Sequence, residues 1–332
     1  MKVAVIGDGG WGTALALTLR RNGHAPCVWG PDAAYIGEIR RTRRNRKFLP
    51  GVELPEDLAW TAEAAEALDG AEAVAVVVPS KYMRAVLEGS AGAYRAAGAP
   101  PALSATKGFD EATRERMTEL LAEAWGASAP AALSGPSIAP ETARGVPTAV
   151  TIASADEAVA RRFQELFTGP TFRAYTSDDV RGVEYGGAFK NVLALAAGVC
   201  DGLGFGHNAK AALLTRGLAE MTRLGVALGA HPQTFQGLSG IGDLMVTCMS
   251  PQSRNRTVGE RLGRGETLAQ ILEGMEQVAE GVWTCSTALA LAREAGVEAP
   301  VMVQVEAILH HGRKPREAVA ELMGRDPRAE RD

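Results

Sequence analysis

The sequence predicts an α/β fold, in which a Rossmann-type doubly wound, mostly parallel sheet is followed by an all-α C-terminal domain. Short runs rich in β-branched and small apolar residues alternate with Ala- and Leu-rich helical stretches through the first half of the chain. One of these runs, 74–78, is apolar throughout, which is typical of a central parallel strand buried on both faces. From about residue 179 the strand pattern disappears and only helical periodicity remains.

The elements follow from the same patterns in chain order. The predicted strands are 3–6, 25–29, 73–78, 102–105, 132–133, 148–152 and 171–174. Helical segments such as 13–22 and 113–125 lie between these strands, and the helices predicted after them are 183–200, 209–228, 253–263, 268–273, 282–294 and 301–309. Ser177, Asp178 and Asp179 are suited to cap the first long helix of the second half. We therefore expect a dinucleotide-binding domain over 1–179 and a helical substrate-binding domain over 180–332.

Composition excludes several classes of protein. The chain has 332 residues, 22% charged and 46% hydrophobic, which is too apolar for a mostly disordered chain. Its 35 basic and 39 acidic residues give a net charge of −4, which argues against a dedicated nucleic-acid binder. We see no apolar run long enough for a membrane span and no signal-peptide pattern. Four scattered cysteines have no metal-ligand or disulfide spacing, so we expect a cytoplasmic protein without a metal.

A glycine-rich turn joins the first predicted strand to the first helix. Gly7, Gly9 and Gly12 have the spacing G-x-G-x-x-G directly after that strand. In such a unit the first glycine permits a tight turn, the second lets a pyrophosphate approach the backbone, and the third lets the helix pack closely. The N–H groups at the helix start then face the phosphates. We therefore predict dinucleotide binding here, in preference to a purely structural turn.

The end of the second predicted strand is the position that distinguishes NAD from NADP. The chain reads Trp29-Gly30-Pro31-Asp32 there, with no acid in the usual place and Asp32 slightly late. No arginine directly follows Gly30 to meet a 2′-phosphate. Six basic residues between positions 40 and 47 lie nearby, and a solvated helix face explains them better than contact with adenosine. The choice between NAD and NADP is therefore left open.

Further polar residues follow predicted strands at the edge where open α/β sheets bind ligands. Lys107 precedes Gly108, so its ammonium can reach into the crevice, although an ordinary turn lysine explains this stretch equally well. Gly135 and Ser137 offer a backbone N–H and a hydroxyl to an oxyanion or amide. On their own, these two residues predict no more than a turn.

Lys190 carries the most information about chemistry. The segment around it, VEYGGAFKNVLALAAGVC, is apolar almost all round, which indicates a buried helix. Its neighbours on the same helix face are all small: Gly186, Gly187, Ala194 and Ala197. A ligand or another backbone can therefore approach Lys190 closely. Buried lysines serve in general acid–base catalysis, and the alternative is a structural lysine paired with a carboxylate.

The segment 237–259 is rich in glycine and contains one acid, Asp243, a candidate partner that orients Lys190. Ser253, Arg254 and Asn255 follow at a predicted helix start. An arginine fork, hydrogen-bonding side chains and a helix N-terminus together suit a phosphate. An N-capping serine beside solvated arginines is the alternative.

The combined motifs resemble soluble NAD(P)-dependent glycerol-3-phosphate dehydrogenases. The resemblance is carried, in family order, by GDGGWGTALA, FLPG, KGF, LSGPSIAPE, GVPTA, EYGGAFKNVLALAAG, GIGDLMVTC, SRN and VAEG. It implies a Rossmann domain, a helical domain and an active site between them. The implied reaction is reversible reduction of dihydroxyacetone phosphate to sn-glycerol 3-phosphate, which feeds glycerophospholipid synthesis. The implied partner is a phosphorylated triose, and a homodimer is compatible with the resemblance.

The resemblance also implies roles for individual residues. Lys190 corresponds to the family's proton acceptor, and Lys107 and Asp243 to further catalytic positions. The implied substrate contacts are Lys107, Gly135, Ser137, Lys190, Asp243, Ser253, Arg254 and Asn255. The implied cofactor contacts are Gly7, Gly9, Gly10, Trp11, Gly12, Lys107, Ala139, Arg254, Val278 and Glu280. The chain departs from the family at Gly10, often Ser or Thr, and near Pro31, where a basic residue or His is common.

Two other functions stay open. One is a related dehydrogenase with the same two-domain plan that acts on a 3-hydroxy acid or a nucleotide sugar. Lys107 and the cluster 253–255 argue against it. The other is a non-catalytic sensor of nicotinamide nucleotides, and the presence of both Lys190 and Asp243 argues against that function.

Overall fold

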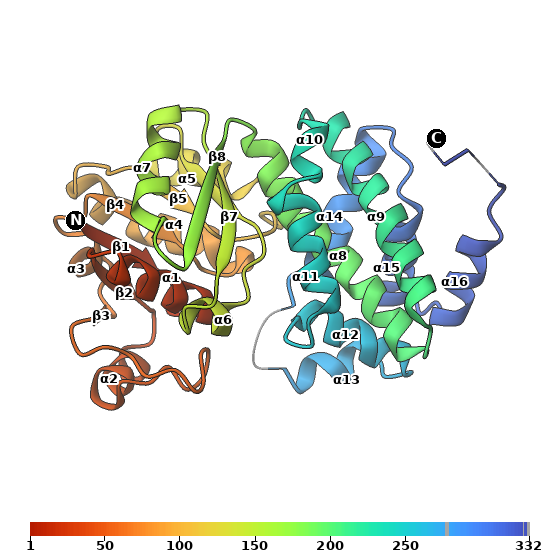
Figure 1. The fold of residues 1–332 in the computed structure, drawn as a ribbon, viewed down its shortest axis with the longest axis horizontal. Helices are drawn as coiled ribbons and strands as arrows, with labels where there is room; N and C mark the ends of the chain where they lie inside the picture. The colour runs from red at the N-terminus through yellow and green to blue at the C-terminus, as the bar shows by residue number, and fades with distance from the viewer. Residues whose placement is uncertain (276–278, 328, 331–332) are drawn as a thin grey trace. The chain divides into compact units, whose positions relative to one another are not determined.

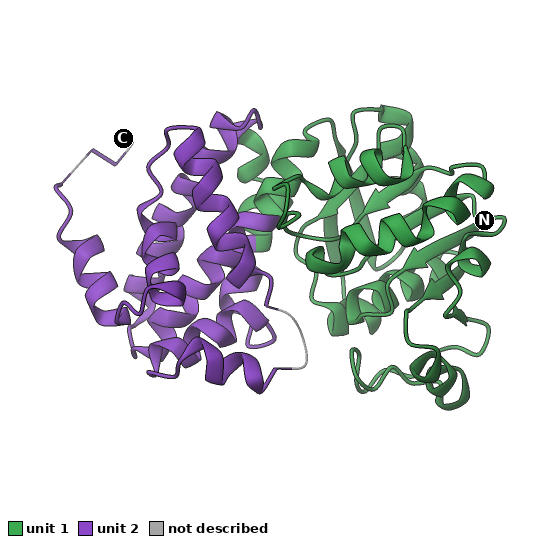
Figure 2. Cartoon of the chain, turned by 180° about the vertical axis from the view of Figure 1, so that it is seen from behind, with its two compact units in different colours: residues 1–187, 233–243 green, residues 188–232, 244–332 purple. Residues whose placement is uncertain are grey.

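The structure is a computed structural model that describes residues 1–275, 279–327 and 329–330. The described chain forms two compact units (Figure 2). Unit 1 comprises residues 1–187 and 233–243, and unit 2 comprises residues 188–232 and 244–332. The division falls within α8 (Val180–Gly202) and at the start of α11 (Asp243–Met249). Two continuous helices therefore contribute residues to both units.

Unit 1 is built on an eight-stranded sheet with the order β3-β2-β1-β4-β5-β6-β7-β8 (Figure 1). The strands are β1 (Lys2–Ile6), β2 (Ala25–Trp29), β3 (Ala59–Thr61), β4 (Ala73–Val76), β5 (Ala102–Ser104), β6 (Ala131–Ser134), β7 (Thr148–Ala153) and β8 (Phe172–Ser177). All neighbouring pairs are parallel except β6 and β7. The strand order reverses between β1 and β4, and such a switch point is where open α/β sheets bind ligands.

Helices cover both faces of this sheet. They are α1 (Gly10–Arg21), α2 (Ala33–Thr42), α3 (Ala64–Leu68), α4 (Ser80–Ala96), α5 (Met117–Trp125), α6 (Ala139–Ala143) and α7 (Glu157–Phe167). Val3 and Val5 of β1 join a core with α1, α2 and α7. Ala4 and Ile6 point the opposite way, into a second core with α3, α4 and α5. This two-layered covering confirms the predicted doubly wound, mostly parallel sheet.

Unit 2 is helical in its described residues. Besides parts of α8 and α11 it contains α9 (His207–Ala227), α12 (Arg254–Gly263), α13 (Leu268–Glu273), α14 (Gly281–Glu294), α15 (Pro300–His310) and α16 (Pro315–Met323). The short α10 (Pro232–Phe235) begins at its edge. From Gly182 to Cys200 every residue of α8 is buried, as its all-round apolar sequence predicts. The all-helical C-terminal region is thereby confirmed.

Most element boundaries agree with the sequence patterns, and two differences have physical reasons. The helix predicted from residue 113 begins at Met117, because the residues before it form a turn in which Thr113 donates to Asp110. The sequence patterns missed β3, which is only three residues long. The predicted cap of the long helix α8 is confirmed, since Asp179 Oδ1 accepts the backbone N–H of Gly182 at 2.9 Å.

Within the described ranges, no helix combines the length and the apolar character that crossing a bilayer requires.

A buried carboxylate caps α15 from another helix of unit 2. Glu220 of α9 is 1% exposed, and its two oxygens accept the backbone N–H groups of Val301 and Met302, each at 2.9 Å. These are among the first N–H groups of α15, which have no partner within the helix. Burial raises the pKa of Glu220 to about 7, although the two backbone hydrogen bonds oppose the increase.

The raised pKa of Glu220 predicts a pH-dependent stability. The folded chain holds a proton on this group that the unfolded chain releases, so stability from this group is lost as pH rises from about 4.5 to about 7. The loss is on the order of 3 kcal/mol. Chemical denaturation of the natural chain and Glu220→Ala at about pH 5 and pH 7.5 tests this. We expect the stability advantage of the natural chain to be larger at the lower pH, and parallel pH profiles would contradict the assignment.

Candidate active site

The glycine turn lies between β1 and α1, at the switch point of the sheet. Gly7 has φ of 132°, which favours glycine, and a Cβ there would lie 2.6 Å from the carbonyl oxygen of Val77. A Cβ at Gly12 would lie 2.0 Å from the carbonyl oxygen of Gly7, so α1 packs directly on the turn. At Gly9, by contrast, a Cβ would meet no atom within 4 Å. The backbone is therefore open at the one glycine where a pyrophosphate must approach, and these residues fit a dinucleotide.

The start of α1 has the features of an anion site. Gly9 is its N-cap and provides no side-chain hydrogen bond, and the first turn contains no acidic residue. A Cβ at Gly10 would lie 2.5 Å from the carbonyl oxygen of Phe48 and 3.7 Å from the Cβ of Ala139. The structure thus places the predicted cofactor residue Ala139 beside the glycine turn. Trp11 follows, half-buried, with its ring 6.5 Å from that of Phe172.

Lys107 is the centre of a buried polar cluster in unit 1. Its ammonium donates to the carbonyl oxygen of Gly135 at 3.1 Å and to Ser137 Oγ at 2.9 Å. It also forms an ion pair of 2.5 Å with Asp243, which is 1% exposed. Lys107 follows β5, Gly135 and Ser137 follow β6, and Asp243 begins α11. The structure therefore brings together four predicted substrate residues from three segments of the chain.

Asp243 reaches this cluster through an irregular segment. The π-helix η1 (Leu238–Gly242) leads into α11, and Gly240 within it has non-helical φ and ψ of −97° and −105°. A Cβ at Gly240 would lie 2.1 Å from the carbonyl oxygen of Phe235, so this path requires glycine. Ser134, at the end of β6, also contacts the Asp243 carboxylate at 3.5 Å. The sequence pattern named Asp243 as a partner that orients Lys190, not Lys107, and that role stays a prediction.

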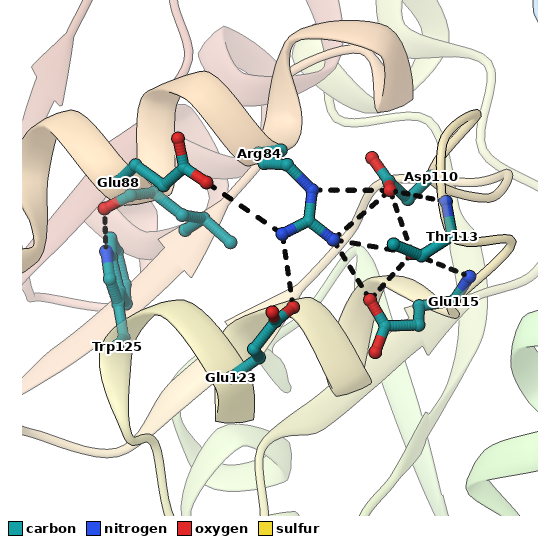
Figure 3. Close-up of polar contacts among 8 residues, drawn as sticks. Arg84, Glu88, Asp110, Thr113, Glu115, Glu123 and Trp125 are labelled. Atoms are coloured by element: carbon teal, nitrogen blue, oxygen red, sulfur yellow. Dashed lines mark hydrogen bonds and ion pairs between the residues drawn. The ribbon is translucent and has the colours of Figure 1, made fainter.

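The loop that carries Lys107 is held by an arginine on α4. Arg84 donates to Asp110 at 3.2 and 3.3 Å and to Glu115 at 3.0 Å, and these acids lie on the loop between β5 and α5 (Figure 3). Asp110 also accepts from the backbone and hydroxyl of Thr113 at 3.0 and 2.8 Å. Thr106 donates its hydroxyl to the carbonyl oxygen of Val78 at 2.6 Å. The backbone on both sides of Lys107 is thereby anchored to α4 and to the loop that follows β4.

A buried ion pair anchors the far end of the same loop. Arg116 donates to Glu184 of α8 at 2.7 Å, and both side chains are less than a tenth exposed. Glu184 also accepts from the backbone and the hydroxyl of Thr118 at 2.9 and 2.6 Å. The carboxylate therefore joins the N-terminal part of α8 to the start of α5, and both belong to unit 1.

Lys190 lies in unit 2 and is 6% exposed, as the sequence predicts. Its ammonium donates to Thr247 Oγ1 of α11 at 2.6 Å. Two small residues one turn before it, both in unit 1, are contacted by protein atoms. A Cβ at Gly186 would lie 2.4 Å from the carbonyl oxygen of Ser239, and one at Gly187 would lie 2.6 Å from Ser134 Oγ. The absence of a side chain at these two glycines therefore admits the backbone of Ser239 and the hydroxyl of Ser134.

The predicted phosphate cluster begins α12. Ser253 is its N-cap and accepts the backbone N–H of Arg256 at 3.3 Å. Asn255 is buried, and its amide donates to Asn191 Oδ1 at 2.9 Å and accepts the backbone N–H of Gly281 at 2.9 Å. Arg254 is exposed, and its side chain forms no ion pair or hydrogen bond with any residue that the structure describes. A cation at a helix start is electrostatically unfavourable, which suits a residue whose partner is an anionic ligand.

Close packing of α8 on α12 fixes this cluster relative to Lys190 within unit 2. Glycines repeat every four residues on both helices, at Gly198 and Gly202 of α8 and at Gly259 and Gly263 of α12. A Cβ at Gly198 would lie 2.0 Å from the carbonyl oxygen of Arg256, and one at Gly259 would lie 2.0 Å from that of Leu195. The two backbones are therefore in direct contact. The glycine repeat is visible in the sequence, and it is the signal from which this contact could have been predicted.

Two further cofactor predictions fall near the start of α14. Glu280 is the N-cap of that helix, directly before Gly281. Val278 lies outside the described residues. Among the residues that the structure describes, no group of three or more His, Cys, Asp or Glu side chains is arranged to hold a metal ion.

The fold and these residues define a class of protein. A glycine turn at the switch point of a parallel sheet binds a dinucleotide, and the lysine cluster after β5 and β6 lies at the ligand-binding edge of that sheet. Together they are typical of an oxidoreductase that uses a nicotinamide coenzyme.

Comparison with known proteins identifies the family. Residues 2–160 match the model of the NAD-dependent glycerol-3-phosphate dehydrogenase N-terminus, and residues 179–320 match that of its C-terminus. The chain belongs to this family and contains its NAD-binding domain. Glycerol-3-phosphate dehydrogenase [NAD(P)+] from Geobacter sp. (strain M21) is 50% identical, over 99% of this chain and 98% of its own. The same enzyme from Thiobacillus denitrificans is 49% identical, over 99% and 100% of the two chains.

Solved structures agree with this assignment. Glycerol-3-phosphate dehydrogenase from Coxiella burnetii has a TM-score of 0.92 at 38% identity, over 98% of this chain and 99% of its own. A ketopantoate reductase from Ralstonia eutropha, at 17% identity and a TM-score of 0.59, shares the fold alone, over 97% of this chain and 100% of its own.

The anchored Lys107 loop generates a prediction about stability. Glu184→Gln removes the buried one of the two carboxylates that pair with Arg116, so we expect a loss of about 3 kcal/mol in the free energy of unfolding. Glu119→Gln is the matched control, because Glu119 pairs with the same guanidinium at 2.6 Å but is 44% exposed. The control should cost less than about 1 kcal/mol. Equal losses in urea denaturation would show that burial of the Glu184 pair is not what anchors the loop.

Proposed function

We propose that the chain catalyses the reversible NAD(P)H-dependent reduction of dihydroxyacetone phosphate to sn-glycerol 3-phosphate. The observation that carries this proposal is full-length membership of the family, together with two lysines that have proposed catalytic roles and that donate hydrogen bonds to oxygen atoms. Lys107 contacts Gly135, Ser137 and Asp243, and Lys190 contacts Thr247. An assay that follows NAD(P)H absorbance with dihydroxyacetone phosphate tests the proposal directly, and no turnover with either coenzyme would refute it.

In the proposed mechanism, Lys107 and Lys190 stabilise and protonate the substrate oxygen on which negative charge develops. When bound, the coenzyme supplies the hydride that adds to the substrate carbonyl carbon. Lys190 holds a proton at Nζ and donates it to the carbonyl oxygen, so that an alcohol forms; in the reverse direction it accepts that proton. Lys107 stabilises the negative charge that develops on the oxygen. Thr247 orients the ammonium group of Lys190, and Asp243 orients that of Lys107.

The substrate phosphate is proposed to bind at the start of α12. Arg254 is exposed there and forms no ion pair within the described part of the chain, so its fork is available to a phosphate. Ser253 and Asn255 lie beside it, and the helix start adds N–H groups and a partial positive charge. Binding energy from this remote group then holds the carbonyl in place for reaction.

The remaining assignments follow from the same family resemblance. We propose that residues 1–179 bind the dinucleotide and that residues 180–332 bind the substrate, with Gly7, Gly9, Gly10, Trp11, Gly12, Ala139, Val278 and Glu280 among the cofactor contacts. We also propose a cytoplasmic location, a role in glycerophospholipid synthesis and a homodimeric state. Size-exclusion chromatography with light scattering tests the last of these.

Substitution of Lys190 tests its role as the acid–base group. Lys190→Ala should abolish turnover while NAD(P)H binding persists, because the lysine acts on the substrate oxygen and not on the coenzyme. Lys210→Ala is the control, since that lysine pairs with Asp201 in the same unit and has no proposed role. Steady-state rates and coenzyme fluorescence titrations provide the two readouts. Near-normal turnover by Lys190→Ala would exclude the role.

Substitution of Arg254 tests the phosphate anchor. Arg254→Ala should raise KM for dihydroxyacetone phosphate by roughly ten- to a hundredfold, the value of a charge-assisted hydrogen bond. The KM for unphosphorylated dihydroxyacetone should change far less. Arg264→Ala, at the other end of α12, is the control and should leave both values unchanged. An equal increase in KM for both substrates would remove the phosphate role from Arg254.

A further inference from the structure

The end of β2 lacks the carboxylate that usually binds the adenosine ribose in a Rossmann fold. In Rossmann folds a carboxylate near this point accepts a hydrogen bond from the 2′-hydroxyl of the adenosine ribose in NAD, and it opposes the 2′-phosphate of NADP. In this chain β2 ends at Trp29, and Gly30 and Pro31 follow without an acid. The carboxylate must therefore come from elsewhere, or be missing.

Asp32 is the acid that follows β2 most closely in the sequence, but in the structure it caps a helix. It is the N-cap of α2, and its Oδ1 accepts the backbone N–H of Tyr35 at 3.0 Å. One of its two carboxylate oxygens therefore caps the start of that helix.

Asp8, in the glycine turn, places its carboxylate at the end of β2. A Cβ on Gly30 would lie 2.6 Å from both Cγ and Oδ2 of Asp8, so the carboxyl group occupies the space that a side chain at position 30 would fill. Asp8 is half-buried, and burial raises the pKa of its carboxyl group. The absence of a side chain at Gly30 is therefore what admits this carboxylate from the first loop.

The backbone of Asp8 is fixed independently of its side chain. Its carbonyl oxygen accepts from Asn45 Nδ2 at 2.7 Å, and Asn45 is fully buried. Asn45 also donates to Thr13 Oγ1 at 2.9 Å and accepts the hydroxyl of Tyr35 at 2.7 Å. Because the bond from Asn45 is made to the main chain of Asp8, a substitution of the Asp8 side chain leaves the turn supported.

Two of the nearby arginines have other partners, and one lysine acts on the Asp8 carboxyl group. Lys47 and Asp32 are the charged groups that act on the Asp8 carboxyl. Arg40 donates to the carbonyl oxygen of Trp60 at 2.7 Å, and Arg46 lies 3.9 Å from Glu38. Lys47 lies 5.0 Å over the ring of Phe48. A carboxylate and one lysine at this position suit a ribose hydroxyl better than a doubly charged phosphate.

We propose that Asp8 is the ribose-recognising carboxylate of this chain and that it makes the protein select NADH over NADPH. The inference rests on the proposed dinucleotide site and adds the coenzyme preference, which the family name leaves undetermined.

Binding measurements on the full chain test this inference without the reaction. We would titrate NADH and NADPH into the natural chain, Asp8→Ala and Asp32→Asn, and follow nicotinamide fluorescence at fixed ionic strength. The readout is the Kd for NADPH divided by the Kd for NADH. Effects of a substitution on binding of the pyrophosphate, which both coenzymes contain, cancel in this ratio. The natural chain should bind NADH at least about tenfold more tightly than NADPH, and Asp8→Ala should reduce that ratio by about tenfold. Asp32→Asn should leave the ratio unchanged.

Three outcomes would overturn the inference. The natural chain could bind NADPH as tightly as NADH, or Asp8→Ala could leave the ratio unchanged. Asp32→Asn could also reduce the ratio as strongly as Asp8→Ala, which would assign the ribose to Asp32. If the natural chain bound neither coenzyme, the proposed function would fail together with the inference. Circular dichroism of Asp8→Ala verifies that the variant is folded.

Discussion

The ion pair between Lys107 and Asp243 is the interaction on which the candidate site depends. A carboxylate that is 1% exposed is costly unless its charge is compensated, and here an ammonium at 2.5 Å compensates it. The same ammonium contacts Gly135 and Ser137, so one charged group aligns the ends of two strands with the start of α11.

Close backbone contact is the second constraint. At the β1–α1 turn and in the α8–α12 crossing, main-chain atoms occupy the space that a side chain would need. In the first case the result is an open helix start beside the switch point of the sheet. In the second, Ser253–Asn255 are held at a fixed distance from Lys190 within one unit. The elements that carry the chemistry are thus positioned by backbone packing, and the polar side chains are added to a rigid frame.

Sequence patterns predicted the sheet and its helical continuation, and they singled out the residues of the candidate site, because these features are local. G-x-G-x-x-G after a strand and an apolar helix around Lys190 can be recognised within about twenty residues. The partner of Lys107 was not predictable in this way, since Asp243 is 136 residues away and arrives through a π-helix. The position of the Asp8 side chain beside Gly30 was missed for the same reason, because the space next to Gly30 is filled from the loop between β1 and α1. Thr247 was visible in the sequence, but its bond to Lys190 depends on how α8 and α11 pack.

The glycine repeat in the α8–α12 crossing limits how this protein can change over generations. Any missense change at one of those four codons introduces at least a methyl group where a neighbouring main-chain atom lies 2.0 to 2.6 Å away. Such a change separates the helices even though none of the four glycines is proposed to touch substrate. The close spacing of α8 and α12 therefore restricts which substitutions this half of the molecule tolerates, in addition to the restriction from catalysis. A substitution at one of these glycines can abolish activity although the residue has no catalytic role.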